Sequence, residues 1–425
     1  MEYNIKMYNV LQLLNNPHLS LKNIIHVTGT TGKTSVSKYL SSILLESSYS
    51  VNTYTAGNVY PNNNRINIKG EYISDNLLSS YIAEVQTIIK DHEVEYTYDQ
   101  TLWLAALLAF KDDSAQFNII ETCEGNINDP TNIFANNQPI VNIVCPINAD
   151  HVQINGNTPE LNAIALSSTI YKNATLILGQ QIKNVHLFFE ELVKTQDCRF
   201  YRWDKDFWTE TACFQTGLSF YTEWKSIFLE IPDSGIKYQA QNIALALMAI
   251  EDNINILPNV NNKTILKGVQ NANIVGQMTK INLDKKDNRN SKFLLSEILI
   301  DFATNNVGGM TITNFIKNIN IVGAHYRNAY IVMSLDTGYD NIGLIKALRP
   351  IAKEFIILEN KKTPNPIQTE NILKIGHITQ IITTAKPNIS NAFNYIINKD
   401  QTARIICVGC ASMYEEIKQI YKIHN

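Results

Sequence analysis

TGTTGKTS, residues 28–35, lies between an apolar run, NIIHV at 23–27, and a segment whose apolar residues recur with helical spacing. The recurring residues, at i, i+4, i+7 and i+8, are Val36, Leu40, Ile43 and Leu44. This pattern predicts a buried strand, a glycine-containing loop and an amphipathic helix. Such a loop directs several backbone N–H groups to one spot, where the helix dipole also favours negative charge. We therefore expect a phosphate site here.

Each position of this loop has an expected role in binding a nucleotide. Lys33 can reach the β and γ phosphates, and the Thr34 hydroxyl can bind Mg²⁺. Further contacts are expected from Gly29, Thr30, Thr31, Gly32 and Ser35. The standard phosphate-loop pattern has glycine where this chain has Val27, so the loop here is a variant that begins at Gly29. A purely structural turn is the alternative, but the strand before and the helix after the loop favour nucleotide binding.

Length and charge narrow the class of protein. A chain of 425 residues is too long for one ordinary core, and we expect two domains. A hydrophobic share of 45% and a charged share of 18% are typical of a globular protein. The net charge of −3 supplies no general field for nucleic acid or an anionic membrane, so neither is expected as a partner. The longest apolar run, Leu102 to Phe110, is far shorter than the roughly 18 residues of a membrane span.

The cysteines and the first residues both point to the cytoplasm. Six cysteines over the whole length are too sparse for a disulfide framework, and Cys407 and Cys410 have no partner pair at zinc spacing. We expect reduced thiols that bind no metal. The first residues lack the charged start, apolar centre and cleavage site of a secretory signal. We expect a cytoplasmic monomer.

Strand-like and helix-like patterns alternate in both halves of the chain, which predicts βα units and largely parallel sheets, an α/β protein. The most polar segment, 282–292, has a composition that cannot be buried in a core. We place the linker within it, at 286–292, between a nucleotide-binding domain at 1–285 and a smaller doubly wound, Rossmann-like domain at 293–425. In the second domain, apolar runs at 298–300, 330–333, 355–358, 381–382 and 404–408 alternate with helical patterns, the last at 413–423.

HVTGTTGKTS at 26–35 and ETCEGNINDPTN at 121–132 resemble two motifs, HVTGTNGKGS and EVGLGGRLDATN, of the folylpolyglutamate and dihydrofolate synthases of the Mur ligase superfamily. Further motifs of that family occur in the same order. Shorter resemblances are NNNRI (62–66) to NERI, KGEYIS (69–74) to INGEPIS, DH with GNT (150–158) to DHxxxLGNT, YQAQN (238–242) to HQxxNA, and DFATN (301–305) to DGAHN. Only 28 residues precede Gly29, too few for the extra substrate domain of cell-wall Mur ligases, which favours the folate branch.

This resemblance implies an ATP-dependent ligase that joins L-glutamate to a folate, or also glutamate to dihydropteroate, through an acyl phosphate. By resemblance Glu121 and His151 bind Mg²⁺, and together with Lys33 they form the catalytic set. Glu121 follows an apolar run and so should lie at the carboxyl edge of the sheet, where α/β folds bind ligands. Asn242 is expected to contact adenine, and Gln277 and Asp301 the nucleotide. A helix cap and a strand-end aspartate are the alternative readings of Asn242 and Asp301.

Five positions lack a charge or a ligand that the family carries. Ala56 replaces a Mg²⁺-binding serine, Ile127 an arginine, Gln277 the arginine of PGR and Thr304 the histidine of DGAHN. Ser168 stands where the superfamily has a carbamoylated lysine, and Lys172 would lie one turn further on if the helix that begins at Thr158 continued. Two further hypotheses therefore stay open: a ligase for another carboxylate, and a nucleotide-binding protein without activity.

Overall fold

The structure, a computed structural model, divides into two compact units, Met1–Asn273 and Ile274–Asn425, each described separately below. It describes residues 2–56, 61–91, 96–134, 139–148, 156, 158–211, 217–230, 236–272, 274–282, 297–321, 328–337, 340–359, 367–380, 382–400 and 402–421. Within these ranges, no helix is both long and apolar enough to cross a membrane.

The first unit is built on an eight-stranded sheet with the order β4-β3-β2-β5-β1-β6-β7-β8. Its strands are β1 (Ile24–Thr28), β2 (Val51–Tyr54), β3 (Ile66–Ile68), β4 (Glu71–Tyr72), β5 (Phe117–Glu121), β6 (Pro139–Val144), β7 (Thr175–Leu178) and β8 (Arg199–Arg202). The strands β2, β5, β1, β6, β7 and β8 run parallel, and β3 and β4 add an antiparallel edge beside β2. Every residue of β1, β2, β5 and β7 is buried. Burial on both faces explains why β1, β5 and β7 are largely apolar in sequence, whereas β2 also buries Asn52 and Thr53.

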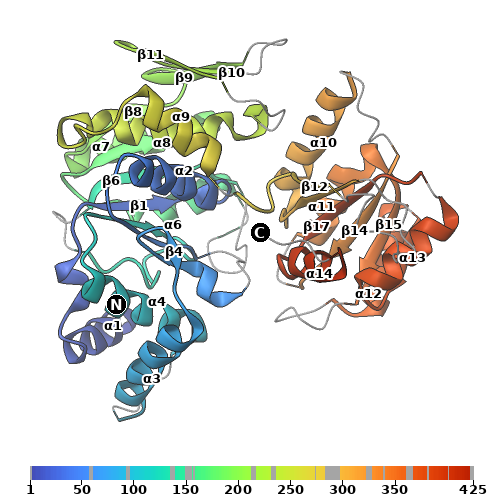
Figure 1. The fold of residues 1–425 in the computed structure, drawn as a ribbon, viewed down its shortest axis with the longest axis horizontal. Helices are drawn as coiled ribbons and strands as arrows, with labels where there is room; N and C mark the ends of the chain where they lie inside the picture. Colours follow the sequence, from blue (N-terminus) through green and yellow to red (C-terminus); the bar gives the residue numbers. More distant parts are fainter. Residues whose placement is uncertain are drawn as a thin grey trace. The chain divides into compact units, whose positions relative to one another are not determined.

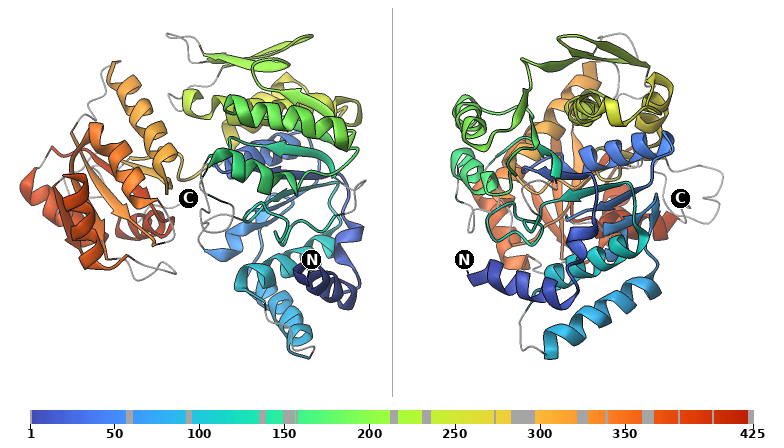
Figure 2. Two further views of the ribbon diagram at one scale, coloured as in Figure 1. Left: turned by 180° about the vertical axis from the view of Figure 1, so that it is seen from behind. Right: turned by 90° about the vertical axis from the view of Figure 1, so that its left-hand side faces the viewer.

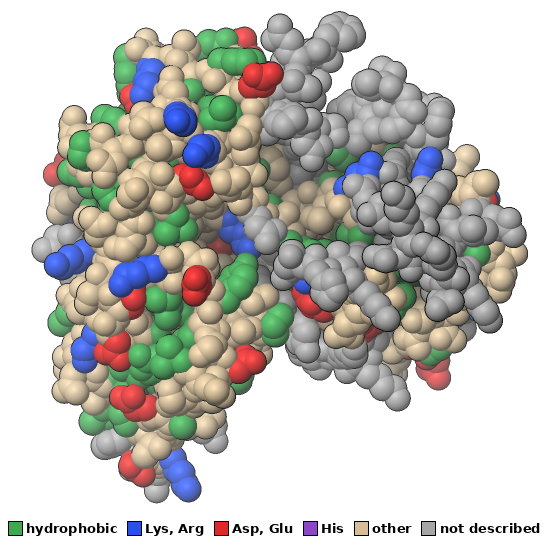
Figure 3. Space-filling view, in the orientation of Figure 1, with side chains coloured by type: hydrophobic (Ala, Val, Ile, Leu, Met, Phe, Trp, Pro, Cys, Tyr) green, Lys and Arg blue, Asp and Glu red, His purple; other side chains and the backbone are tan. Residues whose placement is uncertain are grey.

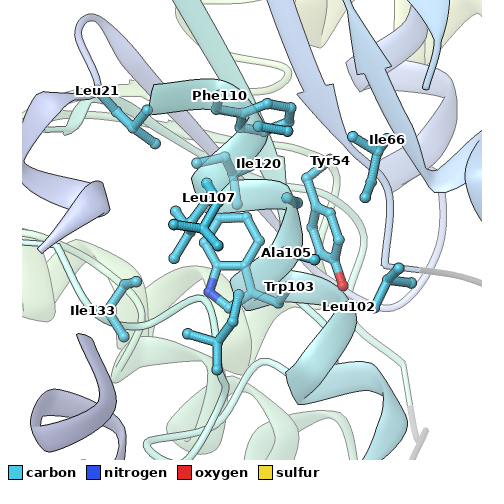
Figure 4. Close-up of a cluster of buried hydrophobic side chains, with 14 of the residues drawn as sticks. Leu21, Tyr54, Ile66, Leu102, Trp103, Ala105, Leu107, Phe110, Ile120 and Ile133 are labelled. Atoms are coloured by element: carbon cyan, nitrogen blue, oxygen red, sulfur yellow. The ribbon is translucent and has the colours of Figure 1, made fainter. Parts of the chain in front are cut away.

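Helices cover both faces of this sheet (Figures 1 and 2). They are α1 (Glu2–Leu13), α2 (Lys33–Glu46), α3 (Asp75–Asp91), α4 (Tyr98–Asp113), α6 (Pro159–Ser167), α7 (Lys183–Gln196), α8 (Ile236–Asp252) and α9 (Asn262–Asn271). On one face α2 packs against α8 and α9. On the other, α4 is buried over its middle ten residues, and its Trp103 ring lies 4.7 Å from that of Tyr54 (Figure 4). These cores fix the orientation of the loops at the sheet's edge.

A separate antiparallel sheet packs on α8 through one apolar face. Its strands are β9 (Phe207–Thr211), β10 (Gly217–Thr222) and β11 (Ser226–Glu230). In β11 buried and exposed residues alternate strictly, which is the pattern of a strand with one face in a core and one in water. Lys and Arg side chains are scattered among Asp and Glu over the visible face of the first unit, as the low net charge leads one to expect (Figure 3).

The second unit contains a six-stranded sheet, ordered β12-β13-β17-β14-β15-β16. Its strands are β12 (Thr279–Asn282), β13 (Glu297–Asp301), β14 (Ala329–Ser334), β15 (Ala352–Leu358), β16 (Thr383–Lys386) and β17 (Ile405–Gly409). Its helices are α10 (Asn306–Ile321), α11 (Asn341–Leu348), α12 (Thr369–Thr379), α13 (Ile389–Lys399) and α14 (Ser412–Tyr421). All strands except β12 run parallel. The α/β class with a smaller doubly wound second domain is thus confirmed.

The division between the units lies earlier in the chain than the expected domain limits of 1–285 and 293–425. It falls after Asn273, because β12 pairs antiparallel with β13 in the second sheet. Residues 279–282 therefore belong to the second unit. The expected linker at 286–292 lies outside the described residues.

Candidate functional site

The loop between β1 and α2 contains two glycines that no other residue could replace without strain. Gly29 and Gly32 have φ angles of +121° and +95°, in the region that favours glycine. A Cβ on Gly29 would lie 2.8 Å from the carbonyl oxygen of Cys145, and one on Gly32 would lie 2.3 Å from Oδ1 of Asn242. The loop is therefore in close contact with the end of β6 and with α8.

Part of the loop is held by a single carbonyl group. Pro146 O accepts hydrogen bonds from Thr30 N at 3.1 Å, Thr31 N at 3.3 Å and Thr30 Oγ1 at 2.9 Å. These two amides thus hold the loop in place in this conformation. The amides of Lys33, Thr34 and Ser35 precede the first hydrogen bond of α2, from Val36 N to Gly32 O at 3.0 Å, and are the ones available to an anion.

Lys33, Thr34 and Glu121 converge at the carboxyl edge of the sheet. Lys33 Nζ donates to Gly29 O at 2.8 Å, so the ammonium group lies over the loop. Thr34 Oγ1 donates to Glu121 Oε2 at 3.1 Å. Glu121 ends β5, and β5 lies directly beside β1, with Val27 paired to Glu121. The sheet order therefore brings together groups that are distant in the sequence.

Glu121 is fully buried, and its Oε1 has no hydrogen-bond partner among the described residues. Burial raises the pKa of Glu121, and the nearby Lys33 ammonium opposes that rise. A buried carboxylate oxygen without a partner, next to a hydroxyl group, suits a hard cation such as Mg²⁺. The described residues contain no cluster of three or more His, Cys, Asp or Glu, but Mg²⁺ is usually held by one or two carboxylates plus substrate phosphates. His151 lies outside the described residues.

The segment that follows Glu121 is organised by Asp129. Its Oδ2 accepts from Glu124 N and Gly125 N, each at 2.7 Å, and its Oδ1 accepts from Thr131 N at 2.9 Å and Thr131 Oγ1 at 2.6 Å. This aspartate is a site residue that was not predicted from the sequence. Its position within the motif at 121–132 was the available signal, since Asp commonly bonds to nearby backbone amides in turns.

His26 connects this segment to β1. Its Nε2 lies 3.0 Å from Thr131 Oγ1, and its Nδ1 lies 3.4 Å from Thr169 O. Burial lowers the pKa of His26 to about 4, although the Asp129 carboxylate acts in the opposite direction. The imidazole is therefore neutral at pH 7 and serves as a buried structural contact behind the loop.

Arg65, in the motif at 62–66, closes the end of β2. Its Nε donates to Thr55 O at 3.0 Å, and its Nη2 donates to Tyr54 Oη at 3.0 Å and Ala56 O at 3.2 Å. Its Nη1 pairs with Asp99 at 2.5 Å. The guanidinium thus fixes the backbone of Ala56, where the family carries a serine ligand.

The other predicted nucleotide contacts occupy different surroundings. Asn242 is buried beside Gly32, and its Nδ2 donates to Gln239 Oε1 at 2.8 Å. Asp301 ends β13, and its two oxygens accept from Met278 N at 3.0 Å and Ala303 N at 2.9 Å. Gln277 lies in the turn that Asp301 stabilises. Asn242 is thus placed at the phosphate loop, while nucleotide contacts by Asp301 and Gln277 stay predictions.

The helix capped by Ser168 ends too early for Lys172 to lie on it. α6 ends at Ser167, Ser168 caps it, and Ser168 Oγ donates to Ala165 O at 2.7 Å. Lys172 follows after a turn and is exposed. The possibility that Lys172 lies one helical turn beyond Ser168 is therefore wrong. Ile127 is 57% exposed, so no buried charge is missing there. Thr304 precedes α10 and is half-buried.

Comparisons with known proteins agree on the kind of fold. The sequence profile of the Mur ligase middle domain matches residues 27–250. A Dictyostelium discoideum protein named as a folylpolyglutamate synthase is 34% identical over 142 residues, which are 33% of this chain and 22% of that protein. The match thus spans only about a fifth of that relative's length.

Two longer similarities extend over most of the chain. The dihydrofolate synthase/folylpolyglutamate synthase of Buchnera aphidicola is 27% identical over 299 residues, 67% of each chain. The crystal structure of Mycobacterium tuberculosis folylpolyglutamate synthase, complexed with ADP and AMPPCP, superposes with a TM-score of 0.81 at 18% identity. That superposition covers 99% of this chain and 96% of the other, so the fold is shared along the whole length.

Proposed function

We propose that this chain, which belongs to the Mur ligase family, is a member of its folylpolyglutamate synthase and dihydrofolate synthase branch, an ATP-dependent ligase that joins L-glutamate to a folate. The observation that carries the proposal is the convergence of Lys33, Thr34 and the buried Glu121 carboxylate at one edge of the sheet. The ADP and AMPPCP bound in the Mycobacterium tuberculosis structure support ATP as a substrate, and the names of the relatives support glutamate and folate. The site itself supplies groups suited to phosphate and a cation.

In the proposed reaction the protein positions the substrates, and no protein side chain acts as a nucleophile. The γ-phosphoryl group of ATP passes to a substrate carboxylate, which gives an acyl phosphate and ADP. The glutamate amine then attacks the acyl carbon, loses a proton and displaces phosphate, leaving an amide bond. Lys33 and the amides that open α2 stabilise the charge on the phosphoryl oxygens during transfer. Mg²⁺, when bound, neutralises further phosphate charge, and Thr34 and Glu121 are the described residues that would hold it.

The substrate range and setting are part of the same proposal. Dihydropteroate is a second candidate acceptor, because the Buchnera relative is named for both activities. The five cysteines that the structure describes are all unbridged, which supports a reducing compartment, and we infer a monomer in the cytoplasm. The losses of charge at Gln277 and Thr304 bear on the rate of turnover. Both positions are separate from Lys33, Thr34 and Glu121, which this chain retains.

One assay tests the proposal against its alternatives. ADP release is measured with Mg²⁺ and ATP, with and without L-glutamate, and with a reduced folate or dihydropteroate as acceptor, and the amide product is identified by mass. Folate-dependent and glutamate-dependent release supports the proposal. Release only with an unrelated carboxylate, or tight ATP binding with no release, would replace it by the other ligase or by the inactive nucleotide-binding protein.

A further inference from the structure

Gln181 is a half-buried residue in the turn that follows β7, and both ends of its side-chain amide bond to the chain segment after β6. Its Nε2 donates to Cys145 O at 3.0 Å, and its Oε1 accepts from Ile147 N at 2.9 Å. The backbone amide of Gln181 in turn donates to His186 Nε2 at 3.2 Å, which fixes the base of the side chain. The side chain of Gln181 therefore hydrogen-bonds to both residues that flank Pro146, namely Cys145 and Ile147.

Pro146 is hydrogen-bonded to the phosphate loop through its carbonyl group. Its carbonyl accepts the three hydrogen bonds from Thr30 and Thr31 described above. Thr30 is also held from the other end of this segment, because Asn148 N donates to Thr30 Oγ1 at 2.9 Å. Asn148 is in turn held by α6, since Asn162 Nδ2 donates to Asn148 O at 2.6 Å. The Pro146 carbonyl lies in one peptide plane with Ile147 N–H, so the bond from Ile147 N to Gln181 Oε1 also orients that carbonyl.

We propose that Gln181 is a positioning residue for the phosphate loop, which it fixes through residues 145–147 without touching the nucleotide. The inference rests on the proposed function in taking that loop to bind ATP. Without the Gln181 bonds, the peptide groups of Cys145 and Ile147 can rotate, and Pro146 O moves away from the amides of Thr30 and Thr31. The start of α2 then samples orientations in which its amides no longer converge on one phosphate.

The test compares Gln181→Met and Gln181→Glu with a matched glutamine. Met keeps the length of the side chain but loses both bonds, whereas Glu keeps the acceptor for Ile147 N and places an oxygen against Cys145 O. Gln116→Met is the control, because Gln116 Oε1 also accepts a backbone amide, Ser50 N at 3.0 Å, but precedes β5 at the amino edge of the sheet. The measurements are ATP affinity by calorimetry, the KM for ATP, kcat and the melting temperature of the full chain.

Gln181→Met is expected to raise the Kd and the KM for ATP about tenfold, since two net hydrogen bonds of ordinary strength are lost. Gln181→Glu should lie between Met and the unchanged protein, and Gln116→Met should leave ATP affinity unaltered. Equal ATP affinity in all three variants, or losses of affinity that only follow the melting temperature, would overturn the proposal. Normal ATP binding by the unchanged protein without amide formation would count against the proposed function alone.

Discussion

The hydroxyl of Thr34 donates a hydrogen bond to the carboxylate of Glu121 across 3.1 Å, although the two residues are 87 positions apart. Thr34 lies in the first turn of α2, and Glu121 lies at the end of the neighbouring strand. The two oxygen-bearing groups thus face one another at the phosphate loop.

Replacing Glu121 with Gln should weaken the response to Mg²⁺. The amide keeps the shape of the side chain but removes the negative charge, and hard cations prefer carboxylate oxygen. We expect the Mg²⁺ concentration for half-maximal activity to rise about tenfold or more, as for the loss of one contact to a charged group. A titration of ATP turnover with MgCl₂ measures this. An unchanged half-point would reassign Glu121 to a structural role.

The same substitution should stabilise the metal-free protein at neutral pH. Burial raises the pKa of Glu121 above its ordinary 4.5, so folding favours the protonated form. The stability that this group contributes is complete below its unfolded pKa and is lost as pH rises through its folded pKa. In EDTA, Glu121→Gln should therefore melt higher than the unchanged protein at pH 7.5, with little difference below pH 4.5. A lower melting temperature at pH 7.5 contradicts this.

Lys33→Ala should abolish turnover and weaken ATP binding while the fold persists. Lys33 Nζ donates to Gly29 O within the loop, so the substitution should leave the cores of the sheet and helices intact. Loss of a charge-stabilising group at a phosphoryl centre costs on the order of 10²-fold or more in kcat. Lys38→Ala, on the same helix with its ammonium at the exposed Tyr72 hydroxyl, is the matched control. Comparable loss of activity in both variants would remove the special role of Lys33.

His26 should make the fold sensitive to acid. Burial lowers its pKa from 6.5 to about 4, so its contribution to stability is present above pH 6.5 and is lost as pH falls toward 4. The full contribution corresponds to roughly 3 kcal/mol. Urea unfolding between pH 7.5 and 4.5 should give a shallower pH slope for His26→Gln than for the exposed control His377→Gln. Parallel slopes would exclude His26 as the source.

Activity should be indifferent to bicarbonate. Ser168 stands where the resembling family carries a carbamoylated lysine, and its hydroxyl is engaged by Ala165 O. Lys172 is exposed beyond the end of α6, so Lys172→Ala should retain full activity. Ser168→Lys, assayed with bicarbonate, is expected to raise turnover at limiting Mg²⁺. Bicarbonate-dependent turnover that disappears in Lys172→Ala would reverse the assignment.

The phosphate loop and the α/β class were predictable because both depend on short stretches of chain. The apolar run at 23–27, the glycines at 29 and 32 and the helical spacing from Val36 to Leu44 specify strand, loop and helix locally. The strand expected near 355–358 is β15, for the same reason. The three-stranded sheet on α8 was not recognised, since its strands are short and separated by segments without a strong pattern.

What only the tertiary structure decided is which distant residues meet at the loop. The order β5-β1-β6 brings Glu121 to Thr34 on one side and Pro146 to Thr30 on the other, over separations of 87 and 116 residues. No local pattern marks Gln181, because its role depends on the turn after β7 reaching the turn after β6. The division after Asn273 likewise depends on β12 pairing with β13. Local sequence specifies each element through backbone preference and periodicity, whereas strand order and register are set by the packing of whole elements against one core.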